Sequence, residues 1–132
     1  MPQTAPKVAI VDDEVSIRTA LARLLTAASF EPKTYPSARD FIDSLGTGAP
    51  DCLVVDIHMP DFSGIDLQSY LRRANRNIPT IVITAFDDLE VRAQCSTLGA
   101  KAFLTKPLRS IDLLQAVDIA TNTSKRRPWR SM

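Results

Sequence analysis

The sequence predicts an α/β fold in which a five-stranded parallel β-sheet lies between two layers of helices, a three-layer α/β/α sandwich. Short apolar runs alternate along the chain with segments whose apolar residues recur at helical spacing, which is typical of repeated β-α-β units. Right-handed crossovers between parallel strands place helices on both faces of the sheet. Four of the apolar runs lead directly into acidic, hydroxyl or basic residues, which indicates a site at one edge of the sheet.

Each strand is expected to be followed by one helix. The expected strands lie near residues 8–11, 31–35, 52–55, 79–83 and 101–104. The expected helices cover residues 15–28, 37–45, 63–74, 87–98 and 110–122. Apolar residues at helical spacing define the buried faces of the first four helices. These residues are Ile17, Leu21, Leu24 and Leu25 in the first, Phe41, Ile42 and Leu45 in the second, Leu67, Tyr70, Leu71 and Ala74 in the third, and Val91, Cys95 and Leu98 in the fourth.

Polar residues and glycines predict where these helices begin and end. Ser37, Ser63, Asp88 and Ser110 precede or begin the four later helices, and their side chains are of the kind that accept a hydrogen bond at a helix N-cap. Gly99 is expected to end the fourth helix, because glycine adopts the left-handed conformation that commonly follows a helix.

Length and composition indicate one domain with its own core. Of the 132 residues, 45% are hydrophobic and 23% are charged, which suffices for a core without disulfides or metals. No apolar stretch approaches the roughly 20 residues of a membrane helix, and the first six residues lack the features of a secretion signal. We therefore expect a cytoplasmic protein in which Cys52 and Cys95 are buried and reduced.

Positive charge gathers at the C-terminus. The net charge is +1, and four of the 16 basic residues stand in the last eight positions, namely Lys125, Arg126, Arg127 and Arg130. The other 12 basic residues face 15 acidic ones, so the body of the chain gives no general reason to bind nucleic acid. Residues 1–122 are predicted to form the domain, and residues 123–132 a basic tail or a truncated linker.

The polar residues at the strand ends are predicted to form one site, because the carboxyl ends of parallel strands line the ligand crevice of an open sheet. Asp12 and Asp13 follow the first strand, and Asp56, Thr84 and Lys106 stand at the ends of later strands. Three carboxylates in one pocket repel one another, and Mg²⁺, which takes oxygen ligands and is often shared with a phosphate, removes that repulsion. A carboxylate can also attack a phosphoryl group, and a hydroxyl and an ammonium group can hold its oxygens.

These residues resemble the receiver domain of bacterial two-component response regulators, over about residues 7–120. The matching positions are Asp12-Asp13, Asp56 with Met59-Pro60 and Gly64, Thr84-Ala85, Gly99-Ala100 and Lys106-Pro107. The segment 99–107 looks like receivers that precede a LuxR-type helix-turn-helix domain. The resemblance implies the flavodoxin-like strand order 2-1-3-4-5 and a cis peptide bond before Pro107.

The resemblance also implies roles at the site. Asp56 would be the phosphoacceptor, with Thr84 and Lys106 holding the phosphoryl oxygens. Mg²⁺ would be bound by Asp56 and by three further groups, namely Asp13 directly, Asp12 mainly through water, and the backbone carbonyl of His58. The implied partners are a sensor histidine kinase or a histidine phosphotransfer protein, and a second copy of the chain in a homodimer that forms on phosphorylation.

In the resembled family, an aromatic residue at the position of Phe103 turns inward when the threonine, here Thr84, moves toward the phosphoryl group. This movement would carry the signal to the face formed by the fourth helix, the fifth strand and the fifth helix. The alternative is that Phe103 is only a packing residue of the core and takes no part in the switch. The chain is then a signalling receiver and not a turnover enzyme. It is either a stand-alone receiver or a fragment of a transcription factor that reaches DNA through a missing output domain.

A second reading of the site is an aspartate-nucleophile phosphatase of the haloacid dehalogenase type. That class also forms an aspartyl phosphate, but it requires an acid two residues after the nucleophile. This chain has His58 there. The sequence therefore favours the receiver and keeps the phosphatase as the alternative.

Overall fold

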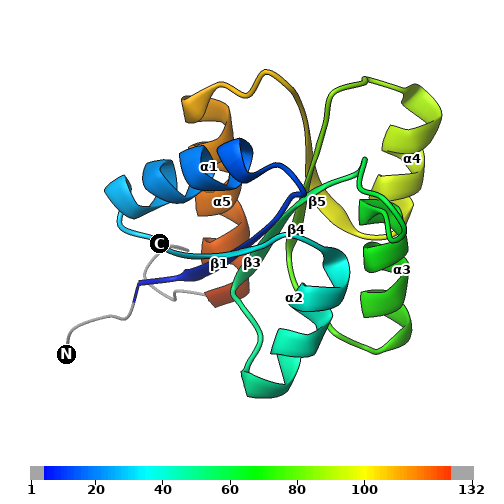
Figure 1. Cartoon of the computed structure of the whole chain (residues 1–132), viewed down its shortest axis with the longest axis horizontal. Helices are drawn as coiled ribbons and strands as arrows, with labels where there is room; N and C mark the ends of the chain where they lie inside the picture. Colours follow the sequence, from blue (N-terminus) through cyan, green and yellow to red (C-terminus); the bar gives the residue numbers. More distant parts are fainter. Residues whose placement is uncertain (1–4, 126–132) are drawn as a thin grey trace, which may run out of the picture.

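The structure is a computed structural model that describes residues 5–125, and it contains five strands and five α-helices in strict alternation (Figure 1). The strands are β1 (Lys7–Val11), β2 (Glu31–Tyr35), β3 (Cys52–Asp56), β4 (Thr80–Thr84) and β5 (Ala100–Thr105). The helices are α1 (Val15–Ala27), α2 (Ala38–Ser44), α3 (Gly64–Arg73), α4 (Leu89–Thr97) and α5 (Ser110–Lys125), and a short 3-10 turn, η1 (Leu45–Thr47), follows α2. The predicted alternation is confirmed.

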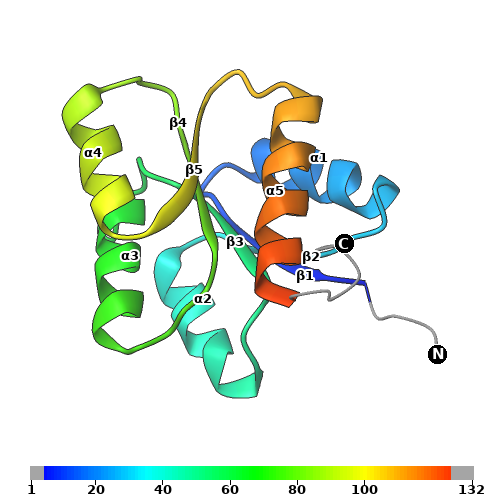
Figure 2. The ribbon, with the colours of Figure 1, turned by 180° about the vertical axis from the view of Figure 1, so that it is seen from behind.

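The five strands form one parallel sheet in the order β2-β1-β3-β4-β5, as the resemblance implied. Helices α1 and α5 cover one face of the sheet, and α2, α3 and α4 cover the other (Figures 1 and 2). The predicted α/β/α sandwich is therefore confirmed. Because all strands run in the same direction, their carboxyl ends meet at one edge of the sheet. The predicted site residues lie at this edge.

Two cores lie on the two faces of the sheet, because successive residues of a strand point to opposite sides. Val55 and Leu67 belong to the core under α2, α3 and α4, and Val54 and Leu113 belong to the core under α1 and α5. Strands β3 and β4 are buried along their whole length, as expected for the centre of a parallel sheet. This rigid centre fixes the residues at the ends of β3 and β4.

The two cysteines are free and buried, as predicted. Burial raises the pKa of Cys52 to about 12, and burial also raises the pKa of Cys95. Both side chains are therefore protonated thiols at neutral pH, which suits small apolar core residues and not nucleophiles.

The helix starts agree with the predicted caps in three cases. Ser37 and Ser63 accept backbone N–H groups of their own helices, and Ser63 forms a full capping box. Asp88 accepts the N–H groups of Glu90 and Val91 at the start of α4. Ser110 instead lies inside α5 as its first residue.

Most predicted boundaries agree with the structure within two residues, and the end of α5 is the exception. This helix continues to Lys125, three residues past the expected end, because no glycine or proline interrupts the chain before Pro128. Residues 126–132, which carry most of the predicted basic tail, lie outside the described residues, so the tail stays a prediction. Within residues 5–125, no helix has the combination of length and apolar character that crossing a bilayer requires.

Candidate functional site

The predicted site residues lie together at the carboxyl edge of the sheet. Asp12 follows β1 directly, Asp56 is the last residue of β3, Thr84 is the last residue of β4, and Lys106 follows β5. The backbone N–H of Lys106 donates to the carbonyl of Thr84 over 2.7 Å, which fixes the start of the β5–α5 loop beside β4. The predicted cis peptide bond between Lys106 and Pro107 is present.

The ammonium group of Lys106 lies between two buried carboxylates. Its Nζ is 2.9 Å from Oδ2 of Asp56 and 3.4 Å from Oδ2 of Asp12. Asp12 is fully buried and Asp56 is 3% exposed. The second oxygen of each carboxylate accepts a backbone N–H, from Glu14 to Asp12 over 2.9 Å and from His58 to Asp56 over 3.0 Å. Both buried carboxylates are therefore held in fixed orientations.

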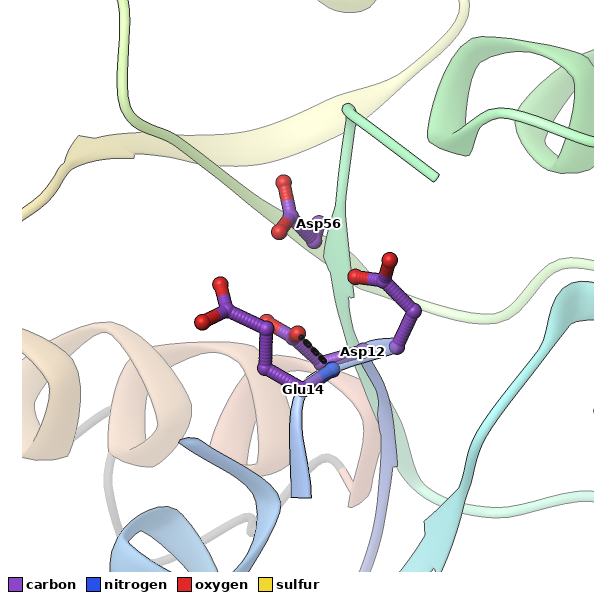
Figure 3. A group of neighbouring side chains, drawn as sticks. Asp12, Glu14 and Asp56 are labelled. Atoms are coloured by element: carbon purple, nitrogen blue, oxygen red, sulfur yellow. Dashed lines mark hydrogen bonds between the residues drawn. The ribbon is translucent and has the colours of Figure 1, made fainter. Parts of the chain in front are cut away.

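Four carboxylates gather at this edge, because Glu14 joins the three predicted acids. Asp12, Asp13, Glu14 and Asp56 each offer an oxygen, and these oxygens all lie within 4.8 Å of one another. Figure 3 shows Asp12 and Glu14 reaching from the β1–α1 loop toward Asp56 at the end of β3. An all-oxygen set of this kind suits Mg²⁺. The donors present therefore fit the predicted magnesium ion.

Sequence reasoning missed Glu14. Glu14 was not among the predicted site residues, although it is the N-cap residue of α1 and its Oε1 lies 3.7 Å from Nζ of Lys106. The run of three acids directly after a strand was the available signal. Arg18 was also missed, and its Nη1 donates to the backbone carbonyl of Asp12 over 2.7 Å, which ties α1 to the acidic loop.

The charges of the site shift the pKa values of two of its groups. Burial has the largest effect on the pKa of the Asp12 carboxyl and raises it, and the charge of Asp56 also raises it. The hydrogen bond from the Glu14 N–H and the interaction with Lys106 lower this pKa without cancelling the rise. Burial alone would lower the pKa of Lys106, but its hydrogen bond to Asp56 and the charges of Asp56 and Asp12 outweigh burial and raise it. One ammonium group thus only partly compensates the carboxylates, which leaves room for a cation.

The hydroxyl of Thr84 is turned toward its own loop. Thr84 is fully buried, and its Oγ1 donates to the carbonyl of Phe86 and accepts the N–H of Phe86, both over 3.1 Å. The Phe86 ring is 68% exposed and packs edge-on against the ring of His58, with 5.3 Å between the centroids. Two aromatic rings, one from the loop after Asp56 and one from the loop after Thr84, therefore pack against each other.

Phe103 lies on the same face of the sheet as Thr84, because it pairs with Val82, two residues earlier in β4. Its ring is partly buried and packs at the edge of the core under α2, α3 and α4. The guanidinium carbon of Arg92, from α4, lies 4.6 Å from the centre of the ring. Sequence reasoning placed Phe103 near the site but did not find this cation–π contact.

Gly64 brings the start of α3 against the end of β3. Its N–H donates to the carbonyl of Ile57 over 3.1 Å. A Cβ atom built at this position would come within 2.7 Å of the backbone oxygen of Asp56 and 3.0 Å of the Cα of Ile57. Only glycine fits this close approach, so Gly64 helps to fix the backbone that carries Asp56.

Comparison with known proteins gives one consistent result. Residues 8–118 match the family model of the response regulator receiver domain. The transcriptional regulatory protein TdiR of Thauera aromatica is 40% identical over 116 residues, which are 88% of this chain and 51% of that protein. Nodulation protein W of Bradyrhizobium diazoefficiens is 37% identical over 118 residues, or 89% of this chain and 52% of that protein. The chain thus spans about half the length of these curated relatives.

Solved structures agree with the sequence relatives. The crystal structure of FixJ-N has 34% sequence identity and a TM-score of 0.83, and the match covers 96% of this chain and 98% of that one. The structure of the response regulator StyR has 36% identity and a TM-score of 0.85, and the match covers 96% of this chain and 65% of that one.

Proposed function

This chain belongs to the response regulator receiver domain family, and from that membership we propose that it accepts a phosphoryl group on Asp56. The proposal rests on the surroundings of the Asp56 carboxylate. Asp56 is 3% exposed, its Oδ2 lies 2.9 Å from the Lys106 ammonium group, and its oxygens lie within a cluster of four acids. The family match favours this reading over the phosphatase alternative.

The phosphoryl donor is proposed to be a phosphohistidine of a sensor histidine kinase or of a histidine phosphotransfer protein. An oxygen of Asp56 attacks the phosphorus atom, the P–N bond of the donor breaks, and the imidazole leaves with the electron pair of that bond. The product is an acyl phosphate on Asp56. Lys106 stays within reach of the new phosphoryl oxygens and balances part of their charge.

Asp12, Asp13 and Asp56 and the backbone carbonyl of His58 are proposed to hold a Mg²⁺ ion, with Glu14 beside them. When bound, this ion supplies the positive charge that offsets the negative charge of the carboxylates and of the phosphoryl oxygens. The protein itself contributes the fixed positions of the carboxylates. The N–H groups of Glu14 and His58 hold Asp12 and Asp56 in place.

Thr84 is proposed to change partners on phosphorylation. Its hydroxyl proton, which is now donated to the Phe86 carbonyl, would be donated to a phosphoryl oxygen, which is a stronger acceptor because it is charged. The β4–α4 loop would follow the hydroxyl, and Phe103 would turn into the space beside β4. The exposed face of α4, β5 and α5 changes as a result, which is the signal that a second copy or an output domain reads.

The whole protein is proposed to be a cytoplasmic signalling protein and not a turnover enzyme. Because the matched segment covers only about half of each curated relative, and one of them is named a transcriptional regulatory protein, an output domain that binds DNA is proposed to act with the receiver. This chain would then contribute no direct DNA contact of its own.

Intact mass spectrometry tests the phosphoacceptor assignment. The protein is incubated with Mg²⁺ and acetyl phosphate, and the wild type is expected to gain one phosphoryl group. Asp56→Asn should gain none, whereas the control Asp61→Asn, an exposed acid in the following loop, should gain one like the wild type. Equal phosphorylation of Asp56→Asn would refute the assignment, and multiple turnover of a phosphate monoester by the wild type would favour the phosphatase.

A further inference from the structure

A hollow lies at the opposite edge of the sheet from the acidic site. It has a volume of about 760 Å³ and is bounded by the end of α3, the loop leading into β4, and the turn between α4 and β5. Sites for small molecules commonly have volumes of about 300–1,000 Å³. The hollow takes no part in the proposed phosphoryl transfer, so its role needs a separate explanation.

The hollow is positively charged. Arg72, Arg76 and Lys101 line it, and none of its lining residues is acidic in the part of the chain that the structure describes. The ends of α3 and α4 also face this region and contribute roughly half a negative charge each, which three full positive charges exceed. The excess of positive charge favours an anionic ligand.

The cationic groups are ready to bind. Nη1 of Arg72 donates to the backbone carbonyl of Thr97 over 3.1 Å, which orients the guanidinium group and leaves its other N–H donors for a ligand. Among the described residues, the side chains of Arg76 and Lys101 form no hydrogen bond or ion pair. A planar guanidinium group favours phosphate because it can bind two of its oxygens at once.

A buried amide gives a second, independent indication of a ligand. Gln68 lines the hollow and is only 3% exposed. Its Nε2 donates to the carbonyl of Cys95 over 3.3 Å, which fixes which way the amide faces. Its Oε1 is buried and has no hydrogen-bond partner among the described residues. A buried acceptor of this kind calls for a donor, which an anion without hydroxyl groups does not supply.

We propose that this hollow binds a small hydroxylated phosphate ester of the sugar phosphate class. Its phosphoryl oxygens accept hydrogen bonds from Arg72, Arg76 and Lys101. One of its hydroxyl groups donates to Oε1 of Gln68 after a local opening of the hollow, because this oxygen is closed to solvent before the ligand binds. Gln68 and Arg72 both bond to backbone carbonyls in the last turns of α4. Ligand binding therefore acts on the C-terminal end of α4. It is coupled in this way to the face formed by α4, β5 and α5.

The test uses the wild-type chain in buffer without Mg²⁺ and three probes, namely ribose 5-phosphate, sulfate and ribose. Amide NMR spectra are expected to show saturable shifts with ribose 5-phosphate that centre on Gly99 and Lys101. Sulfate, an anion without hydroxyl groups, should bind more weakly, and ribose should not bind. Arg76→Gln should weaken binding by at least about tenfold, because it removes a charged pair.

Two further variants separate the parts of the site. Arg73→Gln is the matched control, because Arg73 neighbours Arg72 in α3 but does not line the hollow. It should bind ribose 5-phosphate within about twofold of the wild type, as expected of a distant surface charge. Gln68→Met removes the unpartnered oxygen at similar volume and should reduce the affinity for ribose 5-phosphate to that for sulfate.

Three outcomes would overturn the proposal: no saturable binding of ribose 5-phosphate by the wild type, equal losses in Arg76→Gln and Arg73→Gln, or shifts confined to the acidic edge of the sheet. Circular dichroism of each variant checks that it folds. If Gln68→Met does not fold, the comparison of Arg76→Gln with Arg73→Gln still shows whether ribose 5-phosphate binds in the hollow. Phosphorylation of Asp56 is measured separately, so either proposal can fail alone.

Discussion

Arg92 lies over the ring of Phe103, with 4.6 Å between the guanidinium carbon and the ring centre. The same guanidinium group donates from Nη2 to Oδ1 of Asp87 over 3.0 Å. One side chain of α4 thus contacts both β5 and the loop that follows Thr84. These are the two segments that we propose to move on phosphorylation, so Arg92 restrains them in the arrangement seen here.

Removing this contact should make the switch easier to operate. A cation–π contact at an exposed site contributes about 0.5–1 kcal/mol, so Arg92→Gln should shift the balance toward the active arrangement by about two- to fivefold. The expected readout is a rate of phosphorylation by acetyl phosphate that rises by a similar factor. Arg39→Gln, which removes the longer 5.9 Å contact with Phe62, is the control. An unchanged or slower rate in Arg92→Gln would contradict the restraint.

Asp12→Asn should stabilise the protein in the absence of Mg²⁺. The pKa of Asp12 is raised above its ordinary value of 3.8 in the folded state, chiefly by burial, so the folded protein binds this proton more tightly than the unfolded chain. Stability is therefore lost as the pH rises from 3.8 through the raised pKa. Thermal melts should show the variant above the wild type at pH 7, and this gain should disappear near pH 3. A lower melting temperature at pH 7 would show that the fold prefers the ionised carboxylate.

Mg²⁺ titration by calorimetry separates the two neighbouring acids. Both Asp12→Asn and Asp13→Asn should weaken Mg²⁺ binding, and Asp13→Asn should weaken it more, because a direct ligand acts at closer range than one that binds through water. Equal losses would assign both residues to the same kind of contact.

Lys106→Met should destabilise the protein without Mg²⁺ and bind Mg²⁺ at least as tightly. Without the ammonium group, the buried carboxylates of Asp12 and Asp56 lose their partner, at a cost of about 1–3 kcal/mol. Saturating Mg²⁺ should reduce that cost, because the ion supplies the missing charge. The pKa of Lys106 is raised above its ordinary 10.5, so its contribution is complete below pH 10.5 and is lost only as the pH rises through the raised value. Urea unfolding with and without Mg²⁺ measures both effects, and weaker Mg²⁺ binding would indicate a structural role for the lysine.

The sequence was sufficient to place Asp12, Asp56, Thr84 and Lys106 together, because the topology of a parallel sheet fixes where its strands end. It was not sufficient to find the partners of these groups. The orientation of the Thr84 hydroxyl toward Phe86 depends on the conformation of one loop.

Contacts between separate helices and strands also could not be predicted from the sequence. The stacking of Arg92 on Phe103 depends on how α4 lies beside β5, and the approach of Gly64 to Asp56 depends on how α3 meets β3. Residue spacing predicts faces and ends of elements, but such contacts arise only when the elements pack.

Gly64→Ala should destabilise the protein by about 1–3 kcal/mol, the usual cost of overpacking. The added methyl group meets backbone atoms of Asp56 and Ile57 at 2.7 and 3.0 Å, and these atoms belong to the end of a buried strand. Gly46→Ala is the matched control, since nothing lies within 4 Å of a Cβ atom there, and it should be neutral or slightly stabilising. Urea unfolding of both variants gives the comparison, and a neutral Gly64→Ala would mean that α3 can move away from β3.

Phosphorylation should change hydrogen exchange in α4 and β5 as well as in the loops of the acidic site. The proposed path runs from Asp56 to the Thr84 hydroxyl, then through the loop after β4 to Arg92 and Phe103. Because Arg92 bridges that loop and β5, movement of the loop has to break or carry the stacking contact. Typical coupling energies are about 1–3 kcal/mol, which would change exchange in the coupled segments by roughly five- to a hundredfold. Exchange is compared with and without beryllofluoride as the phosphoryl mimic, and Thr84→Val serves as the uncoupled control because it lacks the hydroxyl. Changes confined to the loops around Asp12, Asp56 and Lys106 in the wild type, or equal changes in α4 and β5 in Thr84→Val, would rule out this path.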